Sequence, residues 1–337
     1  MSAVLQAQPA AAAAAPRALL EVRRLQVRYP LRGRWPWSRT GSMRAVDEIN
    51  FNLHAGQTLG IVGESGCGKS TLARALIGLQ AVSAGAINYN GQELSRLDRK
   101  AWRPLRREIQ MVFQDPLASL SPRMTVGRII GEPLRTLCPE VSKADREARV
   151  LAMLERVGLA HVDAKRYPHE FSGGQCQRIG IARALIVQPK ILICDEPVSA
   201  LDVSVQAQIL NLLADLQREY GLAMIFIAHD LAVVHHLCHR VLVMYLGRMM
   251  EQADRELLFR APAHPYTKAL LSSVPSADGE VRERQVLEGE LPSPANPPPG
   301  CVFATRCPMA DERCSRQVPH VHQLARGTVA ACHYLSN

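Results

Sequence analysis

The segment from Gly63 to Ser70 constrains this chain more than any other. It reads G-E-S-G-C-G-K-S and fits the pattern G-x-x-x-x-G-K-[ST] at every fixed position. Glycines allow such a loop to wrap an anion with successive backbone N–H groups. An apolar strand pattern, Thr58–Val62, precedes the loop, and a helical pattern, Thr71–Ile77, follows it. We therefore predict a phosphate-binding loop at a helix N-terminus, where the helix dipole favours an anion.

This segment, called the phosphate loop below, predicts ATP and Mg²⁺ as ligands. Lys69 would bring a cation to the β- and γ-phosphates, and the Ser70 hydroxyl would ligate Mg²⁺. The residues expected to bind nucleotide here are Gly63, Glu64, Ser65, Gly66, Cys67, Gly68, Lys69, Ser70 and Thr71.

Length and composition limit the class of protein. The chain has 337 residues, of which 47% are hydrophobic, and this suffices for one large domain or two modest ones. Its apolar runs are too short to predict a membrane-spanning helix. The Ala/Pro-rich N-terminus lacks a basic region, so residues 1–18 are predicted to be a disordered tail rather than a signal peptide.

Further apolar runs indicate an α/β fold. Ile191–Cys194 and Ala223–Ala228 alternate with helical patterns, which predicts a mostly parallel sheet covered on both faces. The segment from about 115 to 187 has mainly helical periodicity, and its clearest helix is Arg146–Gly158. The apolar face expected for this helix consists of Ala148, Leu151, Ala152, Leu154 and Val157.

Two carboxylates, Asp195 and Glu196, follow the run that begins at Ile191. They would lie at the C-terminal edge of the sheet, where α/β proteins bind ligands. Asp195 is expected to hold Mg²⁺ directly or through water. Glu196 is expected to orient and deprotonate an attacking water. Together with the phosphate loop, the pair predicts nucleotide hydrolysis.

A second Ser/Gly segment opens another helix but carries no lysine. It comprises Ser172, Gly173, Gly174 and Gln175 and is called the signature segment below. With it, the chain resembles the ATP-binding subunits of ABC transporters, in which S-G-G-Q is the identifying motif. The resemblance implies a P-loop ABC ATPase core with a small antiparallel β subdomain and a helical subdomain. It also implies head-to-tail pairing, with each ATP between the phosphate loop of one chain and the signature segment of the other.

The resemblance assigns further roles. Tyr29 corresponds to the aromatic residue that stacks on adenine, and Gln114 to the glutamine that senses Mg²⁺ and the attacking water. The loop that joins the two sites across the dimer corresponds to Ser199, Ala200, Leu201 and Asp202. His229 corresponds to the switch histidine on the γ-phosphate. The implied catalytic residues are Glu196, His229 and Gln114, and the implied Mg²⁺ residues are Ser70, Gln114 and Asp195.

The composition changes after residue 262, where prolines and cysteines become frequent. His264-Pro265-Tyr266-Thr267 and Pro298-Pro299-Gly300-Cys301 resemble the extension of oligopeptide/dipeptide importer ATPases, most nearly the second ATPase subunit of dipeptide permeases (the DppF type). We therefore expect an ABC ATPase domain at 19–262, with its helical subdomain at about 115–187, and a C-terminal extension at 263–337. The prolines of that extension predict a separate module on a stiff linker.

The resemblance implies ATP hydrolysis that drives dipeptide or oligopeptide import through an inner-membrane permease. Nickel, glutathione and opine importers share the extension and are alternatives. The implied partners are a second ATPase subunit, which would be a paralogue, two permease subunits and, indirectly, a periplasmic or extracellular substrate-binding protein. The subunit would lie peripherally on the cytoplasmic side of the membrane.

A different class of function is a soluble ABC ATPase that acts on nucleic acid. The net charge is +9, and seven arginines between Arg23 and Arg44 alternate with Tyr29, Trp35 and Trp37. Basic and aromatic residues of this kind occur in proteins that bind single strands. Soluble ABC proteins of that class generally carry two ATPase modules, whereas this chain has one, so no nucleic acid is expected as a partner.

Four of the nine cysteines cluster near the C-terminus, namely Cys301, Cys307, Cys314 and Cys332. In a reducing cytosol, clustered cysteines more often bind metal than form disulfides. Four thiolates suit either Zn²⁺ or a [4Fe–4S] cluster. The importer resemblance favours the [4Fe–4S] cluster, and Zn²⁺ or free thiols are the alternatives.

Overall fold

The computed structural model describes residues 17–32, 39–273, 287 and 289–335. The predicted disordered tail lies almost entirely outside these residues. Two sheets occupy the described part of the chain, a large one of eight strands and a small one of four. No helix in the described ranges is long and apolar enough to cross a membrane.

The large sheet has the order β11-β12-β10-β9-β3-β8-β7-β6. Its strands β9, β3, β8, β7 and β6 are parallel to one another, and the other strands run antiparallel to their neighbours. The parallel strands are β3 (Thr58–Val62), β6 (Ile109–Val112), β7 (Ile191–Asp195), β8 (Ala223–Ala228) and β9 (Arg240–Tyr245). The remaining strands are β10 (Arg248–Asp254), β11 (Val321–Gln323) and β12 (Val329–Ala331). The prediction of a mostly parallel sheet is confirmed.

Alternate residues of the central strands enter two separate hydrophobic cores, as the period of a strand requires. In β7, Ile191 and Ile193 join one core, while Leu192 and Cys194 join the other. The first core contains α1 (Lys69–Leu76) and the small sheet. The second contains α6 (Gly173–Leu185), α7 (Val203–Tyr220) and α8 (Leu231–Leu237). Burial on both faces explains the unbroken apolar runs.

The small sheet is antiparallel, with the order β2-β1-β4-β5. Its strands are β1 (Leu20–Arg32), β2 (Arg39–Leu53), β4 (Ala84–Tyr89) and β5 (Gln92–Glu93), and α2 (Trp102–Glu108) follows them. The basic segment forms the β1–β2 hairpin, where Arg23 pairs with Glu21 and Arg44 with Asp47. Trp35 and Trp37 lie outside the described residues.

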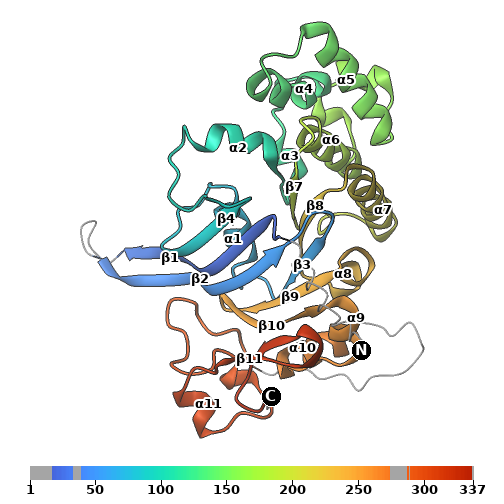
Figure 1. Ribbon diagram of the computed structural model, residues 1–337. Helices are drawn as coiled ribbons and strands as arrows, with labels where there is room; N and C mark the ends of the chain where they lie inside the picture. Colours follow the sequence, from blue (N-terminus) through green and yellow to red (C-terminus); the bar gives the residue numbers. More distant parts are fainter. Residues whose placement is uncertain (1–16, 33–38, 274–286, 288, 336–337) are drawn as a thin grey trace, which may run out of the picture.

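The predicted helical segment forms one end of the molecule (Figure 1). It contains α3 (Pro116–Ser119), α4 (Val126–Leu137), α5 (Lys143–Arg156) and the 3₁₀ turns η1 (His161–Lys165) and η2 (Pro168–Glu170), and it leads into α6. The helix expected at Arg146–Gly158 begins earlier, because the Ser142 hydroxyl caps it by accepting from the Asp145 N–H.

The apolar face predicted for α5 was right in part, since Leu154 and Val157 are buried and Leu151 packs against the core. Its buried residues are Val150, Met153 and Leu154, whereas Ala148 and Ala152 are exposed. Several small apolar residues left more than one face possible, and packing against α4 selects the actual one.

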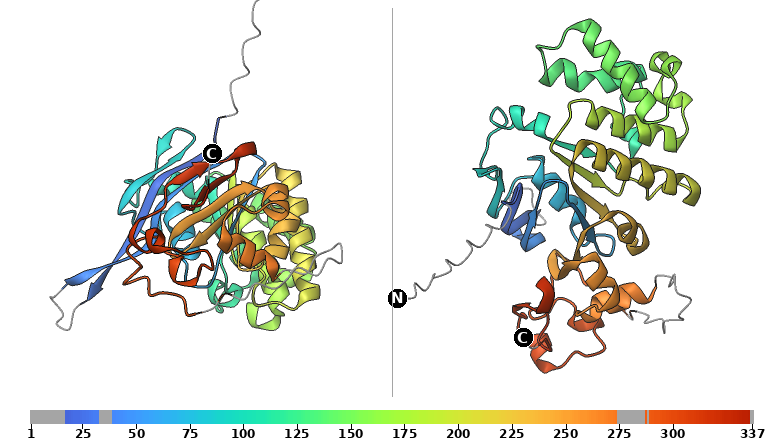
Figure 2. Two further views of the ribbon diagram at one scale, coloured as in Figure 1. Left: turned by 90° about the horizontal axis from the view of Figure 1, so that it is seen from below. Right: turned by 45° about the vertical axis from the view of Figure 1, so that its right-hand side comes forward.

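The C-terminal extension lies at the end of the molecule opposite α4 and α5 (Figures 1 and 2). Its elements are α10 (Pro265–Ser272), η3 (Ala304–Arg306), α11 (Glu312–Arg316), β11, η4 (Ala325–Gly327) and β12, and α9 (Arg255–Arg260) precedes it. The extension is continuous with the large sheet, since β12 pairs with β10 through Glu251 opposite Ala330. Its Phe303 and Tyr266 also enter the second core. The expected separate module is therefore packed onto the ATPase sheet.

Candidate functional site

The phosphate loop joins β3 to α1 in a conformation that requires glycine at two positions. Gly63 has φ 154° and Gly68 has φ 103°. A Cβ atom on Gly68 would lie 2.0 Å from the carbonyl oxygen of Ala45, and one on Gly63 would lie 2.1 Å from that of Met244. The neighbouring backbone thus packs directly against the loop, and side chains are excluded there.

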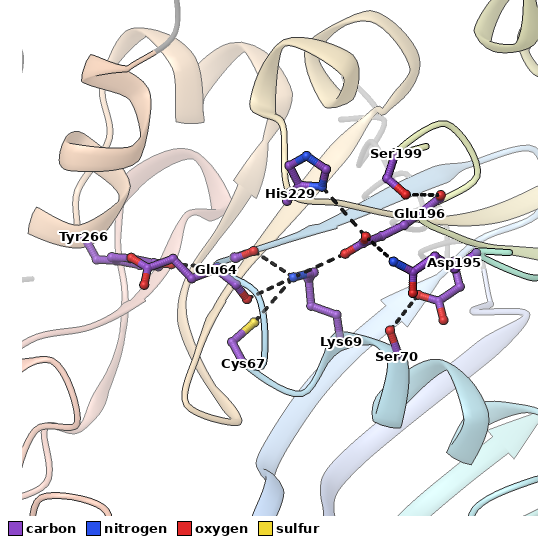
Figure 3. A network of polar contacts seen from close by, with 11 residues as sticks. Glu64, Cys67, Lys69, Ser70, Asp195, Glu196, Ser199, His229 and Tyr266 are labelled. Atoms are coloured by element: carbon purple, nitrogen blue, oxygen red, sulfur yellow. Dashed lines mark hydrogen bonds and ion pairs between the residues drawn. The ribbon is translucent and has the colours of Figure 1, made fainter. Parts of the chain in front are cut away.

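Lys69 is buried at the centre of the loop (Figure 3). Its Nζ donates to the carbonyl oxygens of Gly63 at 2.8 Å and Glu64 at 3.0 Å. Glu196 Oε1 lies 3.8 Å from the same Nζ. The ammonium group is therefore held by loop carbonyls, and a carboxylate of the β7 end balances its charge.

Ser70 meets the first carboxylate, Asp195, at the end of β7. The Ser70 hydroxyl donates to Asp195 Oδ1 at 2.9 Å. Burial raises the pKa of Asp195, and the hydrogen bond from Ser70 opposes this rise. A hydroxyl and a carboxylate side by side are oxygen donors of the kind that Mg²⁺ prefers, so these residues fit the expected ion.

Glu196 contacts side chains that follow two further strands, β6 and β8 (Figure 3). Its Oε2 accepts from Gln114 Nε2 at 2.9 Å, and His229 Nδ1 lies 3.8 Å from the same oxygen. The Glu196 backbone is left-handed, with φ 45°, and its N–H donates to the Ile227 carbonyl at 3.1 Å. Such a conformation is strained for a residue with a side chain and is typical of functional sites.

These groups surround one pocket of about 220 Å³. Its lining residues are Met43, Ala45, Ser65, Gly66, Gly68, Lys69, Ser70, Thr71, Gln114, Glu196 and Pro294. The structure thus brings together the phosphate loop, Gln114 and Glu196, which are far apart in the sequence.

Sequence reasoning missed Met43, Ala45 and Pro294 as pocket residues. None of them belongs to a pattern with chemistry of its own, and the fold alone brings them to the loop. The expected adenine platform, Tyr29, does not line the pocket, although it lies opposite Met43 in the β1–β2 ladder. Its hydroxyl donates to Gln80 Oε1 at 3.0 Å, so its role stays a prediction.

The signature segment forms the start of α6 and does not line this pocket. Ser172 and Gln175 make reciprocal hydrogen bonds, in which the Ser172 hydroxyl accepts from the Gln175 N–H and the Gln175 side chain accepts from the Ser172 N–H. A Cβ atom on Gly174 would lie 2.5 Å from Val205 of α7. The segment is therefore rigidly seated, with a free helix N-terminus that resembles an anion site.

The loop between β7 and α7 links Glu196 to the start of α7. The Ser199 hydroxyl donates to the Glu196 carbonyl at 3.1 Å, and Gln206 Nε2 donates to that of Leu201 at 2.9 Å. Asp202 is the N-cap residue of α7. This loop, Ser199–Asp202, is therefore joined by a hydrogen bond to the backbone of Glu196.

Comparison with known proteins shows which family this chain represents. The ABC transporter family matches residues 46–199, and the oligopeptide/dipeptide transporter C-terminal region matches residues 250–314. The oligopeptide transport ATP-binding protein OppF of Salmonella typhimurium is 56% identical over 89% of this chain and 92% of its own length. The chain belongs to the oligopeptide/dipeptide branch of the ABC transporter family. Bacillus subtilis AppF, named as an oligopeptide transport ATP-binding protein, is 52% identical over 94% of this chain and 98% of its own.

Solved ABC ATPase structures share the fold. The ATP-binding cassette MJ0796, in a dimeric post-hydrolysis state bound to ADP and Pi, aligns with a TM-score of 0.63 at 28% identity. That alignment covers 70% of this chain and 98% of MJ0796. The structure of cbiO1 from Clostridium perfringens, part of an ABC transporter complex, aligns with a TM-score of 0.62 at 31% identity over 72% of this chain and 91% of its own. The predicted ABC ATPase fold is confirmed.

The expected [4Fe–4S] cluster at Cys301, Cys307, Cys314 and Cys332 was wrong. Among the described residues, no group of three or more His, Cys, Asp or Glu side chains could hold a metal, and this leaves Zn²⁺ without support as well. The similar ABC proteins are named as oligopeptide transport ATP-binding proteins only. Burial raises the pKa of Cys301 to about 11 and also raises that of Cys307 and Cys314, which favours thiols over the thiolates that metals need.

Proposed function

We propose that this chain binds Mg²⁺ and ATP at the phosphate loop and hydrolyses ATP to drive oligopeptide or dipeptide import through a membrane permease. The observation that supports this most strongly is the pocket that the phosphate loop, Gln114 and Glu196 line together. Asp195 adjoins this pocket through its hydrogen bond from Ser70, and His229 adjoins it through Glu196. The family of the chain, and the names of its relatives, support the coupling of hydrolysis to peptide transport.

The proposed roles follow from the positions of the side chains. Lys69 and the loop N–H groups would hold the β- and γ-phosphates. Ser70 and Asp195, with Gln114, would hold Mg²⁺, which would neutralise charge on the phosphate oxygens. Glu196 would accept a proton from the attacking water while Gln114 orients it.

His229 would contact the γ-phosphate once it is in place. Its side chain is 57% exposed and lies at the edge of a small pocket that it shares with Glu196 and Ser199. An exposed imidazole beside the general base can turn toward an entering phosphate without breaking the core. We infer that it reports the presence of the γ-phosphate to the Ser199–Asp202 loop.

A second ATPase subunit would complete the site. The signature segment is preorganised at the start of α6 but does not line the pocket of its own chain. Head-to-tail pairing would place the Ser172 hydroxyl and the α6 N-terminus of one chain on the ATP of the other. Membership of a peptide importer branch favours a paralogue as that partner.

A larger cleft of about 780 Å³ suits the permease contact. It lies between α2 and α4, and its lining includes Trp102, Phe113 and Pro133. Gln114 and Asp195 of the nucleotide site also line it. A permease element docked there would therefore touch residues of the nucleotide site. Docked on the permease in this way, the subunit would lie peripherally on the membrane.

Peptides are the substrate class that the relatives favour over nickel, glutathione or opines. A substrate-binding protein would act indirectly, through the permease. The relatives, which are named as peptide transport proteins, do not favour the nucleic-acid alternative.

The proposal is tested by purifying the tagged protein from native membranes in mild detergent and identifying the chains that accompany it. We expect two permease subunits and a second ATPase, and the complex should hydrolyse ATP. Recovery of the protein only from the soluble fraction, alone or with nucleic acid, would contradict the proposed function.

A further inference from the structure

Arg306 of the C-terminal extension reaches the phosphate loop. Its Nη1 donates to both carboxylate oxygens of Glu64, at 3.0 and 2.8 Å. The Arg306 side chain is only 8% exposed, and that of Glu64 is 27% exposed. A partly buried ion pair is screened less by salt than an exposed one, so it differs from the exposed Arg316–Glu312 pair in the same extension.

The same extension also holds the backbone of Glu64. The Glu64 N–H donates to the Tyr266 hydroxyl at 3.1 Å, while the Glu64 carbonyl accepts from Lys69 (Figure 3). Every polar group of this loop residue is therefore engaged, two of the three by residues that follow the ATPase sheet in the sequence. The position of Glu64 depends on how the extension is placed.

Aromatic packing keeps these two contacts in place. Tyr266 and Phe303 pack with Tyr245 of β9, with ring centroids 4.9 Å and 5.3 Å from that of Tyr245. Arg306 lies 5.9 Å from the same Tyr245 ring. All three aromatic side chains are fully buried, so the groups that touch Glu64 project from a rigid base.

A third contact comes from the proline-rich part of the extension, where Pro294 lines the nucleotide pocket beside the phosphate loop. The extension thus contributes Pro294 to the pocket lining and also holds a residue of the loop.

We propose that the C-terminal extension is part of the nucleotide site, and that Arg306 and Tyr266 are positioning residues that act on ATP through Glu64. This inference rests on the proposed ATP site. Arg306 neutralises a carboxylate within the loop that receives the triphosphate, and Tyr266 fixes the backbone of that loop. By reciprocity, bound ATP stabilises the placement of the extension.

The test compares Arg306→Gln with the wild-type chain by titrating the full-length protein with a fluorescent ATP analogue and Mg²⁺. We expect affinity to fall about tenfold, within the usual range for coupled sites. Glu64→Gln combined with Arg306→Gln should recover most of the affinity, because the unpaired carboxylate is gone. Arg316→Gln is the matched control, since Arg316 forms an exposed pair with Glu312 in the same extension and should bind as wild type does.

Recovery in the double variant would trace the lost affinity to the unpaired Glu64 carboxylate. Tyr266→Phe removes only the hydroxyl that accepts from Glu64 and should weaken binding severalfold, so it carries the test if Arg306→Gln does not fold. Unchanged affinity in the folded Arg306→Gln or Tyr266→Phe protein would overturn the inference. A wild-type chain that binds no ATP analogue would instead overturn the proposed function.

Discussion

The phosphate loop and the signature segment are both Ser/Gly-rich turns that open a helix, yet their surroundings differ. The phosphate loop contains Lys69, lies beside the carboxylates at the end of β7 and is held through Glu64 by the C-terminal extension. The signature segment has no lysine, and its Ser172 and Gln175 hydrogen-bond to each other. The first site is assembled within one chain, whereas the second is rigid but incomplete.

This difference shows how a single chain can keep ATP binding separate from ATP turnover. The proposed binding residues lie around one pocket, so one chain suffices for affinity. The signature segment lies outside that pocket, so in the proposed pairing it would contribute only to the site of a partner. Variants of the two segments should therefore change different measurements.

Glu196→Gln should have the largest effect. We expect turnover to fall about 10³-fold, because the side chain can no longer accept a proton from water. ATP binding should persist. Two subunits should therefore stay paired as long as ATP is bound, with the phosphate loop of one and the signature segment of the other on the same unhydrolysed nucleotide. Steady-state hydrolysis and gel filtration with ATP measure both effects.

Glu147→Gln is a suitable control for that experiment, since Glu147 forms an exposed pair with Lys143 on α5. Its turnover should match that of the parent. Hydrolysis by the Glu196→Gln protein at the parental rate would contradict the role assigned to Glu196.

Replacing a glycine by alanine should lower ATP affinity in the phosphate loop but not in the signature segment. Gly68→Ala forces a Cβ atom against the Ala45 carbonyl at positive φ, which costs roughly 1–3 kcal/mol and should reduce ATP affinity by about tenfold to 100-fold. Gly173→Ala meets only Leu201 Cδ2 at 3.5 Å, so binding by one chain should not change. Titration with ATP compares them, and equal losses would mean that the segments are not independent.

Ser172→Ala should reduce turnover of the assembled transporter by about tenfold, the typical cost of a lost hydrogen bond to a charged group. ATP affinity of the single chain should stay the same. Ser142→Ala is the matched control, because Ser142 caps α5 in the same way and lies outside the site. Each substitution removes a helix cap and should lower the free energy of unfolding by about 1 kcal/mol. If both variants lost turnover, the loss would come from the missing cap and not from a contact of Ser172 with ATP.

The smallest expected effect is a loss of folding stability in acid, which would act on the phosphate loop and not on the signature segment. Burial lowers the pKa of His264, the N-cap residue of α10, to about 4. Because this value lies below that of the unfolded chain, the related stability is complete above about pH 6.5 and is lost as the pH falls toward 4. Between pH 8 and pH 6 we expect a loss of about 1 kcal/mol, measured by urea unfolding.

His264→Gln should flatten that pH dependence. Since α10 carries Tyr266, the acid-weakened element is one that holds the phosphate loop, and the signature segment has no comparable titrating group. An unchanged pH slope in the variant would assign the acid sensitivity to other groups.

Motifs carried the predictions that succeeded. The alternating apolar runs gave the parallel sheet, because a strand buried on both faces has no other sequence pattern. The phosphate loop and the β7 carboxylates were proposed from local chemistry, whereas Gln114 was proposed from the family resemblance. The fold brings these residues into hydrogen-bonding distance of one another. The role of the signature segment was likewise proposed from the family resemblance.

Long-range packing could not be predicted in this way. Arg306 and Glu64 are 242 positions apart, and neither belongs to a pattern that names the other. Met43 and Pro294 reach the pocket only because β2 and the extension pack beside the loop. The cysteine cluster misled because proximity in sequence was taken for a metal site, although no group of three or more such side chains among the described residues could hold a metal.

The pairing of β12 with β10 has a further consequence for solubility. β10 spans Arg248–Asp254 and would be the edge of the large sheet without the extension. A long open edge is a template for pairing with other chains, whereas the final strand here, β11, has only three residues. The extension thus covers an edge of the ATPase sheet that could otherwise pair with other chains. A chain truncated after α10 would lack β12 and would leave the backbone groups of β10 unpaired.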